Sequence, residues 1–370
     1  MKKIVVIGAG AAGLVAAAEA SKRGLEVIIL EHMPRPARKI LVTGKGRCNV
    51  TNNCNIEEFI SQMTKNGRFM YSAFSNFTAQ DTISFFEGCG VQLKTERGNR
   101  VFPKSDRAMD IADALVKNAK KSGAVFKTGK AEKILVEDSA VKGVLLCDGT
   151  RIECDGAVLA TGGCSYPATG SDGSGYKIAR EAGHNIIKPI ASLIPVVARE
   201  GWCEQLQGLS LRNVALNVYQ SQTGKKVFSG FGEMMFTHFG MTGPLVLSAS
   251  AHTRDLPDVP YNFEIDLKPA LTHEQLDARI LKDFSLYSGR DFCNCLGDLL
   301  PKSLIPVIVG LSGIPKNTKA NQITKKQREG LTALIKRLCL EAIDLRPIEE
   351  AIVTSGGIDV GQINPKTMES

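Results

Sequence analysis

The segment Ile4-Val5-Val6-Ile7-Gly8-Ala9-Gly10-Ala11-Ala12-Gly13 decides the fold of the first part of the chain. Its apolar beginning predicts a buried strand over residues 3–7, and the small residues from Ala11 to Arg23 predict a helix that ends at Gly24. Between them stand three glycines with the spacing Gly-x-Gly-x-x-Gly. The first permits a tight turn, the second lets a pyrophosphate approach the backbone, and the third lets the helix pack on the strand.

A second apolar run over residues 26–30 predicts the next strand, and it ends on Glu31, 18 residues past Gly13. This carboxylate can accept hydrogen bonds from both ribose hydroxyls of an adenosine, while the helix N-terminus faces the anion. The complete unit predicts a dinucleotide site, although it does not by itself separate FAD from NAD. The segment Gly170–Gly175 has the order G-x-x-G-x-G, which differs from the Gly-x-Gly-x-x-Gly fingerprint of dinucleotide-binding turns. No other segment of the chain combines a strand, this fingerprint and a helix, so we expect no dedicated NAD(P)H domain.

Composition places the chain among ordinary folded proteins. Its 370 residues are 43% hydrophobic and 23% charged, which allows two or three cores and excludes a disordered or low-complexity protein. The net charge of +8 is spread along the chain, suits an anionic cofactor or acidic substrate, and is weak support for nucleic acid. Ten cysteines without a CxxC pair predict neither a zinc cluster nor a disulfide framework. We expect a soluble cytoplasmic protein without a signal, transit or membrane-spanning segment.

Patterns beyond residue 31 predict an α/β region followed by a second region near residues 190–345. A long irregular loop over 34–53 is predicted to be functional. Ser105 or Asp106 is the predicted cap of a helix over 106–122. The other predicted helices are 57–63, 78–88, 173–182, 272–284, 296–309 and 325–340, and the predicted strands are 131–136, 141–146, 151–154, 157–160, 214–219 and 226–229.

Several motifs resemble those of one known family. The stretch Arg38–Asn52, which reads RKILVTGKGRCNVTN, is similar to the signature of the HI0933-like flavoproteins, also labelled aminoacetone-oxidase-like or NAD(P)/FAD-dependent oxidoreductases. Four further segments match in the family's order, so the resemblance spans essentially the whole chain. They are 158–163 (VLATGG), 170–176 (GSDGSGY), 232–244 (GEMMFTHFGMTGP), and 353–357 (VTSGG) with 365–370 (PKTMES).

The resemblance implies FAD in a doubly wound, Rossmann-like domain of the glutathione-reductase type, with inserted β-barrel-like and helical domains. We therefore predict an FAD-binding domain at 1–189, continued by 346–370, a β-rich domain at 190–270 and a helical domain at 271–345. Family members continue beyond the segment 365–370 with a strand and a glycine-rich turn. The resemblance accordingly implies that further backbone belongs to the isoalloxazine side of the site.

The predicted FAD contacts follow from physical roles within these motifs. Arg38 and Lys39 offset negative charge, backbone amides of the turn 44–48 approach the flavin ring, and Ala131 is a backbone partner for adenine. Thr161 and Gly162 end a buried strand at the sheet edge where ligands of such folds bind. The full predicted set is Gly8, Gly10, Ala11, Ala12, Gly13, Glu31, His32, Arg38, Lys39, Gly44, Gly46, Arg47, Cys48, Asn49, Ala131, Thr161 and Gly162.

The flavin carries the electrons, so few residues are diagnostic of the reaction. His238 is a candidate proton donor, although a lone histidine is more often structural, and Arg47 and Tyr166 are candidates for carbonyl recognition. Cys48 has no partner at redox spacing, so packing is its better interpretation. We predict no metal.

Three functions remain open. The first is reduction of a C=C bond conjugated to a ketone in a 3-oxo-Δ4,6 steroid or bile acid, with NAD(P)H as a transient donor. The second is oxidation of an amine such as aminoacetone, with release of hydrogen peroxide. The third is a non-catalytic flavin-binding protein with a regulatory or RNA-linked role. The first is preferred, with a small-molecule substrate and neither a nucleic-acid nor a membrane partner.

Overall fold

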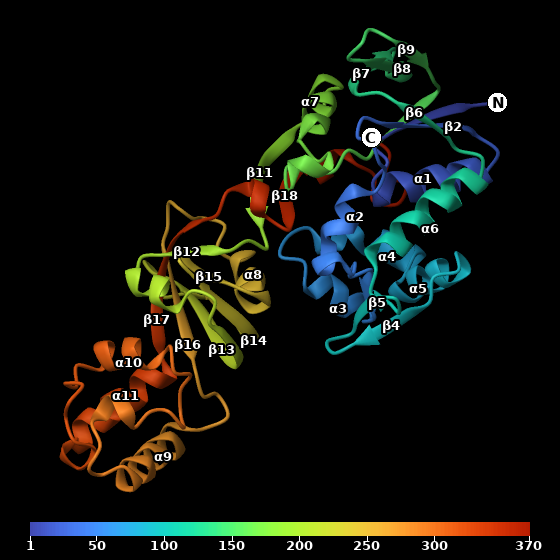
Figure 1. The fold of residues 1–370 in the computed structure, drawn as a ribbon. Coiled ribbons are helices and arrows are strands. Elements are labelled where there is room, and N and C mark those ends of the chain that lie inside the picture. The colour runs from blue at the N-terminus through green and yellow to red at the C-terminus, as the bar shows by residue number, and fades with distance from the viewer. The chain divides into compact units, whose positions relative to one another are not determined.

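The computed structural model describes residues 1–370, and the chain divides into two compact units (Figure 1). The first unit comprises residues 1–190 and 354–370, and the second comprises residues 191–353. The second unit is therefore inserted into the first. Two paired strands, β11 (Ile186–Ser192) and β18 (Val353–Ile358), contain the two points at which the chain passes between the units.

A four-stranded parallel sheet forms the centre of the first unit. Its order is β10-β1-β2-β6, and each neighbouring pair is parallel. Parallel strands buried on both faces are continuous apolar runs, which is why Ile4–Ile7 carries no polar residue. All four carboxyl ends meet at one edge of the sheet. The strands are β1 (Lys3–Ile7), β2 (Glu26–Glu31), β6 (Val125–Thr128) and β10 (Gly156–Leu159).

Alternate residues of β1 serve two different cores. Val6 faces α1 (Ala11–Lys22) and α6 (Ala108–Lys121), which pack against each other on one side of the sheet. Val5 and Ile7 face the opposite side. That side is covered by α7 (Ser174–Glu181) and by a three-stranded antiparallel sheet of β7 (Ala131–Glu137), β8 (Ala140–Leu146) and β9 (Arg151–Glu153).

The rest of the first unit follows β2. The irregular loop predicted over 34–53 contains a short helix, α2 (Arg38–Val42), and a 3-10 turn over Thr43–Gly46. A small antiparallel sheet of order β3-β5-β4 comes next in the fold. The strands of this sheet are β3 (Thr51–Asn52), β4 (Leu93–Glu96) and β5 (Arg100–Pro103). Three helices lie between β3 and β4 in the sequence: α3 (Ile56–Ser61), α4 (Tyr71–Asn76) and α5 (Ala79–Gly88).

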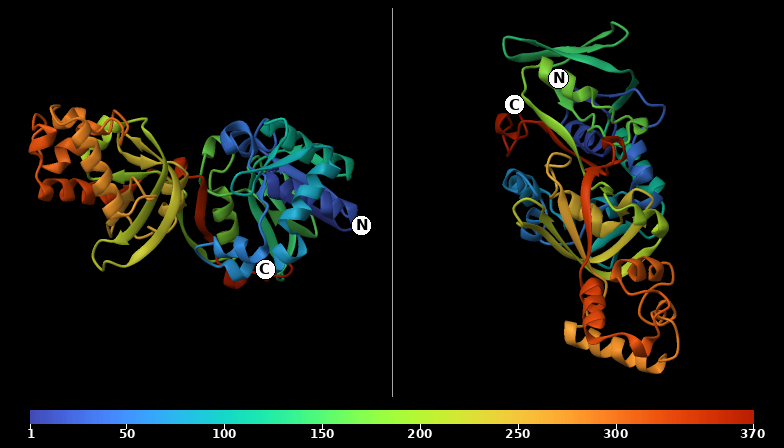
Figure 2. Two further views of the ribbon diagram at one scale, coloured as in Figure 1. Left: turned by 90° about the horizontal axis from the view of Figure 1, so that it is seen from below. Right: turned by 90° about the vertical axis from the view of Figure 1, so that its left-hand side faces the viewer.

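The second unit is a closed barrel with helices attached (Figure 2). Around the barrel the order is β12 (Val196–Ala198), β15 (Gly240–Thr242), β14 (Lys226–Thr237), β13 (Ser210–Gln220), β16 (Tyr261–Asp266) and β17 (Leu338–Leu345). The helices are α8 (Pro244–Ser250), α9 (His273–Leu286), α10 (Ile305–Ser312) and α11 (Lys325–Lys336). Phe236 and Phe263 of the barrel belong to the same apolar core as Leu276 of α9 and Leu331 of α11. The division into a β-rich and a helical domain stays a prediction.

The predicted fold class is confirmed, and three local predictions were wrong. The helix predicted over 296–309 begins only at Ile305, because Pro301 interrupts the hydrogen-bonding ladder. The helix predicted over 325–340 ends at Lys336, because the next residues pair with β16 and β12 as strand β17. The predicted cap of α6, Ser105 or Asp106, was wrong, because the helix starts after Arg107 and no side chain caps it. No helix in the structure has the length and apolarity that crossing a bilayer demands.

Candidate cofactor site

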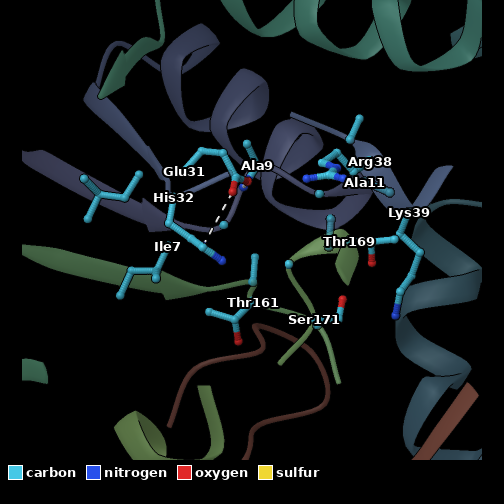
Figure 3. Close-up of a pocket in the computed structure, with 18 of the residues that line it drawn as sticks. Ile7, Ala9, Ala11, Glu31, His32, Arg38, Lys39, Thr161, Thr169 and Ser171 are labelled. Atoms are coloured by element: carbon cyan, nitrogen blue, oxygen red, sulfur yellow. Dashed lines mark hydrogen bonds and ion pairs between the residues drawn. The ribbon is translucent and has the colours of Figure 1, made fainter. Parts of the chain in front are cut away.

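A cavity of ≈ 570 Å³ lies in the first unit, at the edge where the parallel strands end. Ile7, Glu31 and Leu159, the last residues of β1, β2 and β10, all line it. In open α/β sheets, ligands bind at this edge where neighbouring connections run in opposite directions. Figure 3 shows Glu31 and His32 on one side of the cavity, Arg38 and Lys39 on the other, and Thr161 between them.

The three fingerprint glycines have three different environments. Gly8 has φ of +103°, and a Cβ there would lie 2.6 Å from the carbonyl oxygen of Ala160. A Cβ on Gly13 would overlap the carbonyl oxygen of Gly8, so only glycine allows α1 to pack this closely on the strand. At Gly10 no atom lies within 4 Å of the same position, which leaves the backbone open to the cavity. A pyrophosphate fits beside Gly10, at the N-terminus of α1.

Glu31 holds the glycine turn in place. One carboxylate oxygen accepts the backbone N–H of Ala9 at 2.9 Å, and the other accepts that of Met33 at 2.8 Å. The side chain is only 15% exposed, and the imidazole of His32 lies 3.6 Å from it. A carboxylate oxygen accepts more than one hydrogen bond, so Glu31 still has capacity for ribose hydroxyls.

Lys130 and Asp172 form an ion pair at 2.8 Å near the start of β7. Burial raises the pKa of Asp172, but hydrogen bonds from Lys130 and from the Ser174 backbone outweigh it and hold the pKa well below its usual range. Lys130, Ala131 and Ser174 all line the cavity. The pair thus joins the β6–β7 connection to the start of α7 on this side.

Arg38 and Lys39 bring positive charge to the other side. Both line the cavity from α2, and neither forms an ion pair with a carboxylate of the chain. The Lys39 ammonium donates to the hydroxyl of the buried Ser165 at 3.2 Å, and burial lowers the pKa of Lys39. Two cations without a counter-ion are suited to a ligand that carries phosphate charge.

The rest of the predicted flavin loop lies elsewhere. Thr43 lines the cavity, whereas Gly44, Gly46, Arg47, Cys48 and Asn49 do not. Cys48 is buried in the core of the first unit, and burial raises the pKa of its thiol. This agrees with the packing interpretation of Cys48 and does not support a redox role.

Of the three candidate catalytic residues, Arg47 and Tyr166 belong to the first unit and do not line the cavity, and His238 belongs to the second unit. Arg47 forms ion pairs with Glu96 and Asp106, and its guanidinium lies 4.1 Å from the centre of the Phe102 ring. Tyr166 is 42% exposed and has φ of +50°. His238 belongs to the second unit, in the turn between β14 and β15, where its ring contacts Phe239. Their roles stay predictions.

Several cavity residues were missed by the sequence reasoning. Thr169, Gly170 and Ser171 come from the connection between β10 and α7, and Arg35 precedes α2. The glycine-rich segment 170–175, which leads into α7, was a usable signal for two of them, Gly170 and Ser171. Arg35 pairs with Asp113 of α6 at 2.8 Å, a contact between residues 78 positions apart that no local pattern reveals.

The chain is similar to several other proteins over nearly its whole length. A ribosomal RNA dihydrouridine synthase of Escherichia coli is 30% identical, over 99% of this chain and 88% of that protein. A 3-dehydro-bile acid delta(4,6)-reductase of Clostridium scindens is 29% identical, over all of this chain and 90% of that protein. A solved structure of a 3-ketosteroid-delta4-(5alpha)-dehydrogenase from Rhodococcus jostii matches 98% of this chain and 87% of that chain, with 14% identity and a TM-score of 0.44.

A parallel sheet with a glycine turn, an acid at the end of the second strand and a cationic cavity is the arrangement of a Rossmann-type dinucleotide-binding domain. The model of the HI0933-like protein Rossmann domain matches residues 2–370. The chain therefore belongs to the HI0933-like Rossmann family of FAD-dependent oxidoreductases, as its motifs suggested.

Proposed function

We propose that this protein is an FAD-dependent reductase that saturates a C=C bond conjugated to a carbonyl group, with NAD(P)H as electron donor. The supporting observation is that the reactions for which two of its relatives are named concern the same type of bond. Dihydrouridine is uridine whose C5=C6 bond, conjugated to the C4 carbonyl, has been reduced. A 3-dehydro-Δ4,6 bile acid carries double bonds conjugated to the 3-oxo group. One kind of chemistry therefore serves both substrates.

The electron balance of the reaction is simple. NAD(P)H gives up a hydride and becomes NAD(P)⁺, one substrate carbon accepts a hydride, the neighbouring carbon accepts a proton, and the C=C bond becomes a single bond. Bound FAD supplies the hydride-transfer chemistry. The chain would hold the adenosine ribose with Glu31, the pyrophosphate at the N-terminus of α1, and the remaining negative charge with Arg38 and Lys39.

Uridine in RNA is the first candidate substrate, and a 3-oxo-Δ4 steroid is the second. Sequence identity does not separate them, since the ribosomal RNA dihydrouridine synthase of Escherichia coli is 30% identical and the bile-acid reductase is 29% identical. Charge favours RNA. The first unit carries 28 lysine and arginine against 21 aspartate and glutamate residues, a net charge of +7, while the second unit carries 18 against 17, a net charge of +1.

The test compares substrates on the purified full-length protein loaded with FAD. NADH and NADPH oxidation would be followed with a uridine-containing ribosomal RNA fragment and with a 3-oxo-Δ4 steroid, and products identified by mass. We expect a gain of two hydrogens in one substrate, coupled to NAD(P)H oxidation. Hydrogen peroxide from aminoacetone without NAD(P)H would overturn the proposal in favour of amine oxidation. Failure to retain FAD would overturn it as well.

Single substitutions test the roles proposed for Lys39 and His238. We expect Lys39→Met to weaken FAD retention, measured by the flavin absorbance that remains after gel filtration, while the exposed Lys133→Met does not. His238→Gln should lower turnover and remove an ionisation from its pH profile if the imidazole donates the proton. An unchanged profile would leave His238 structural.

A further inference from the structure

A group of lysines lies at the C-terminal ends of α1 and α6, and we call it the α1/α6 lysine surface. It consists of Lys22 on α1 and Lys117, Lys120 and Lys121 on α6, all exposed. Between Asp113 and Glu132 the chain carries five lysines and no acidic residue. This surface is distinct from the cavity, which lies at the N-terminal end of α1.

The structure brings these lysines together from two helices. Helices α1 and α6 pack against each other, and Lys117, Lys120 and Lys121 line one shallow hollow together with Val116 and Asp113. Lys22 and Lys121 both lie near Cys89, where their charges oppose the larger, pKa-raising effect of burial on that thiol. The ammonium of Lys120 also lies 5.5 Å from the centre of the Phe126 ring.

Little acidic charge neutralises this surface. Lys22 pairs with Glu19 at 2.7 Å, whereas Lys117, Lys120 and Lys121 form no ion pair. The nearest acid on α6, Asp113, is engaged by Arg35 at 2.8 Å. The surface therefore offers several uncompensated positive charges to a polyanion, within the unit that carries nearly all of the net charge.

We propose that the α1/α6 lysine surface binds the phosphate backbone of structured RNA while the same unit holds the FAD that reduces the substrate base. This inference rests on the proposed function and names the part of the molecule that holds the substrate. Phosphate contacts orient a nucleic acid without reading its sequence. The 12 residues of α1 span roughly 18 Å, so one short RNA stem can extend from the lysines toward the cavity.

The experiment measures RNA affinity without turnover. Full-length protein would bind a fluorescent, structured ribosomal RNA fragment at several salt concentrations. The variant K117Q/K120Q/K121Q removes three charges from the surface. The matched control K133Q/K142Q/K366Q removes three exposed lysines from elsewhere in the same unit, so both variants have the same net charge. Far-ultraviolet circular dichroism and retained flavin absorbance would establish that both fold.

We expect the surface variant to bind RNA at least about tenfold more weakly, with a log Kd–log salt slope smaller by roughly 2 to 3. The control should bind like the parent protein. Equal losses in both variants would attribute binding to net charge alone and overturn the inference. Binding of anionic vesicles instead of RNA would overturn it too.

Failure of the surface and failure of the proposed function are distinguishable. RNA binding that depends on these lysines, with no reduction of uridine, would support the surface and contradict the proposed RNA substrate. Reduction of a 3-oxo-Δ4 steroid by a protein that binds no RNA would overturn the surface and leave the reductase function standing.

Discussion

The hydrogen bonds of Glu31 predict that its substitution destabilises the protein even before any cofactor binds. Its carboxylate accepts two backbone N–H groups, from Ala9 at 2.9 Å and from Met33 at 2.8 Å, and thereby ties the glycine turn to the end of β2. Glu31→Ala removes both acceptors. A hydrogen bond to a charged group contributes about 1.5–3 kcal/mol. Because water in the cavity can reach the freed amides, we take the lower end, about 3 kcal/mol for the pair.

For a unit of this size, a loss of about 3 kcal/mol corresponds to a Tm lower by roughly 6–12 °C. Glu31→Gln keeps an acceptor for only one amide, so its loss should be intermediate. The matched control is Glu26→Ala, at the other end of the same strand, where the carboxylate forms only an exposed ion pair with Lys3. We expect that control to stay close to the parent protein.

Two readouts separate a local effect from a global one. Hydrogen exchange of cofactor-free protein reports on peptides covering residues 3–31. Trp202, the chain's single tryptophan, reports by fluorescence on the second unit. We expect faster exchange in the first unit and an unchanged Trp202 transition. Equal protection of residues 3–31 in Glu31→Ala and Glu26→Ala would refute the reasoning.

Two further predictions concern the second unit. Burial raises the pKa of Tyr261 from 10.0 to about 12, aided by its hydrogen bond to Asp255, and burial raises that of Cys203 from 9.0 to about 12. Both groups hold their protons more tightly when folded, so their stabilisation is full below about pH 9 and is lost as pH rises toward 12. Urea midpoints from Trp202 fluorescence should therefore fall at alkaline pH, and less steeply in Tyr261→Phe; a parallel fall would contradict this. Separately, Arg328 of α11 donates to both oxygens of Asp277 on α9, at 2.7 and 2.9 Å. Arg328→Lys cannot keep this two-pronged geometry and should lower the free energy of unfolding by about 1–2 kcal/mol, whereas Lys325→Gln, in an exposed pair, serves as the near-neutral control.

Local sequence predicted the part of the site that is local in the structure. The β1–α1–β2 unit and its acid lie within 31 residues, and each glycine meets a neighbour that excludes a side chain or faces open space. The helix capped by Thr78 was placed almost correctly for the same reason, since its capping box is local.

Long-range pairing explains most of what was missed. Strand β17 continues a helix-like sequence, and only its partners β12 and β16 make it extended. Arg47 looked available for a ligand, but Glu96 and Asp106, 49 and 59 positions away, hold it. The net charge looked diffuse along the chain, and its concentration in one unit emerged only when the unit boundaries were known.

The insertion of the second unit also has a consequence for protein synthesis. The N–H of Cys164, just after the cavity residues Thr161 and Gly162, donates at 2.9 Å to the hydroxyl of Thr354, which is made 190 residues later. At about 5–20 residues per second, that wait lasts roughly 10–40 seconds. The nascent chain thus forms this hydrogen bond, close in sequence to the cavity residues, only after the entire barrel has been translated. We expect cofactor capture on the ribosome to come late, even though the glycine turn is made first.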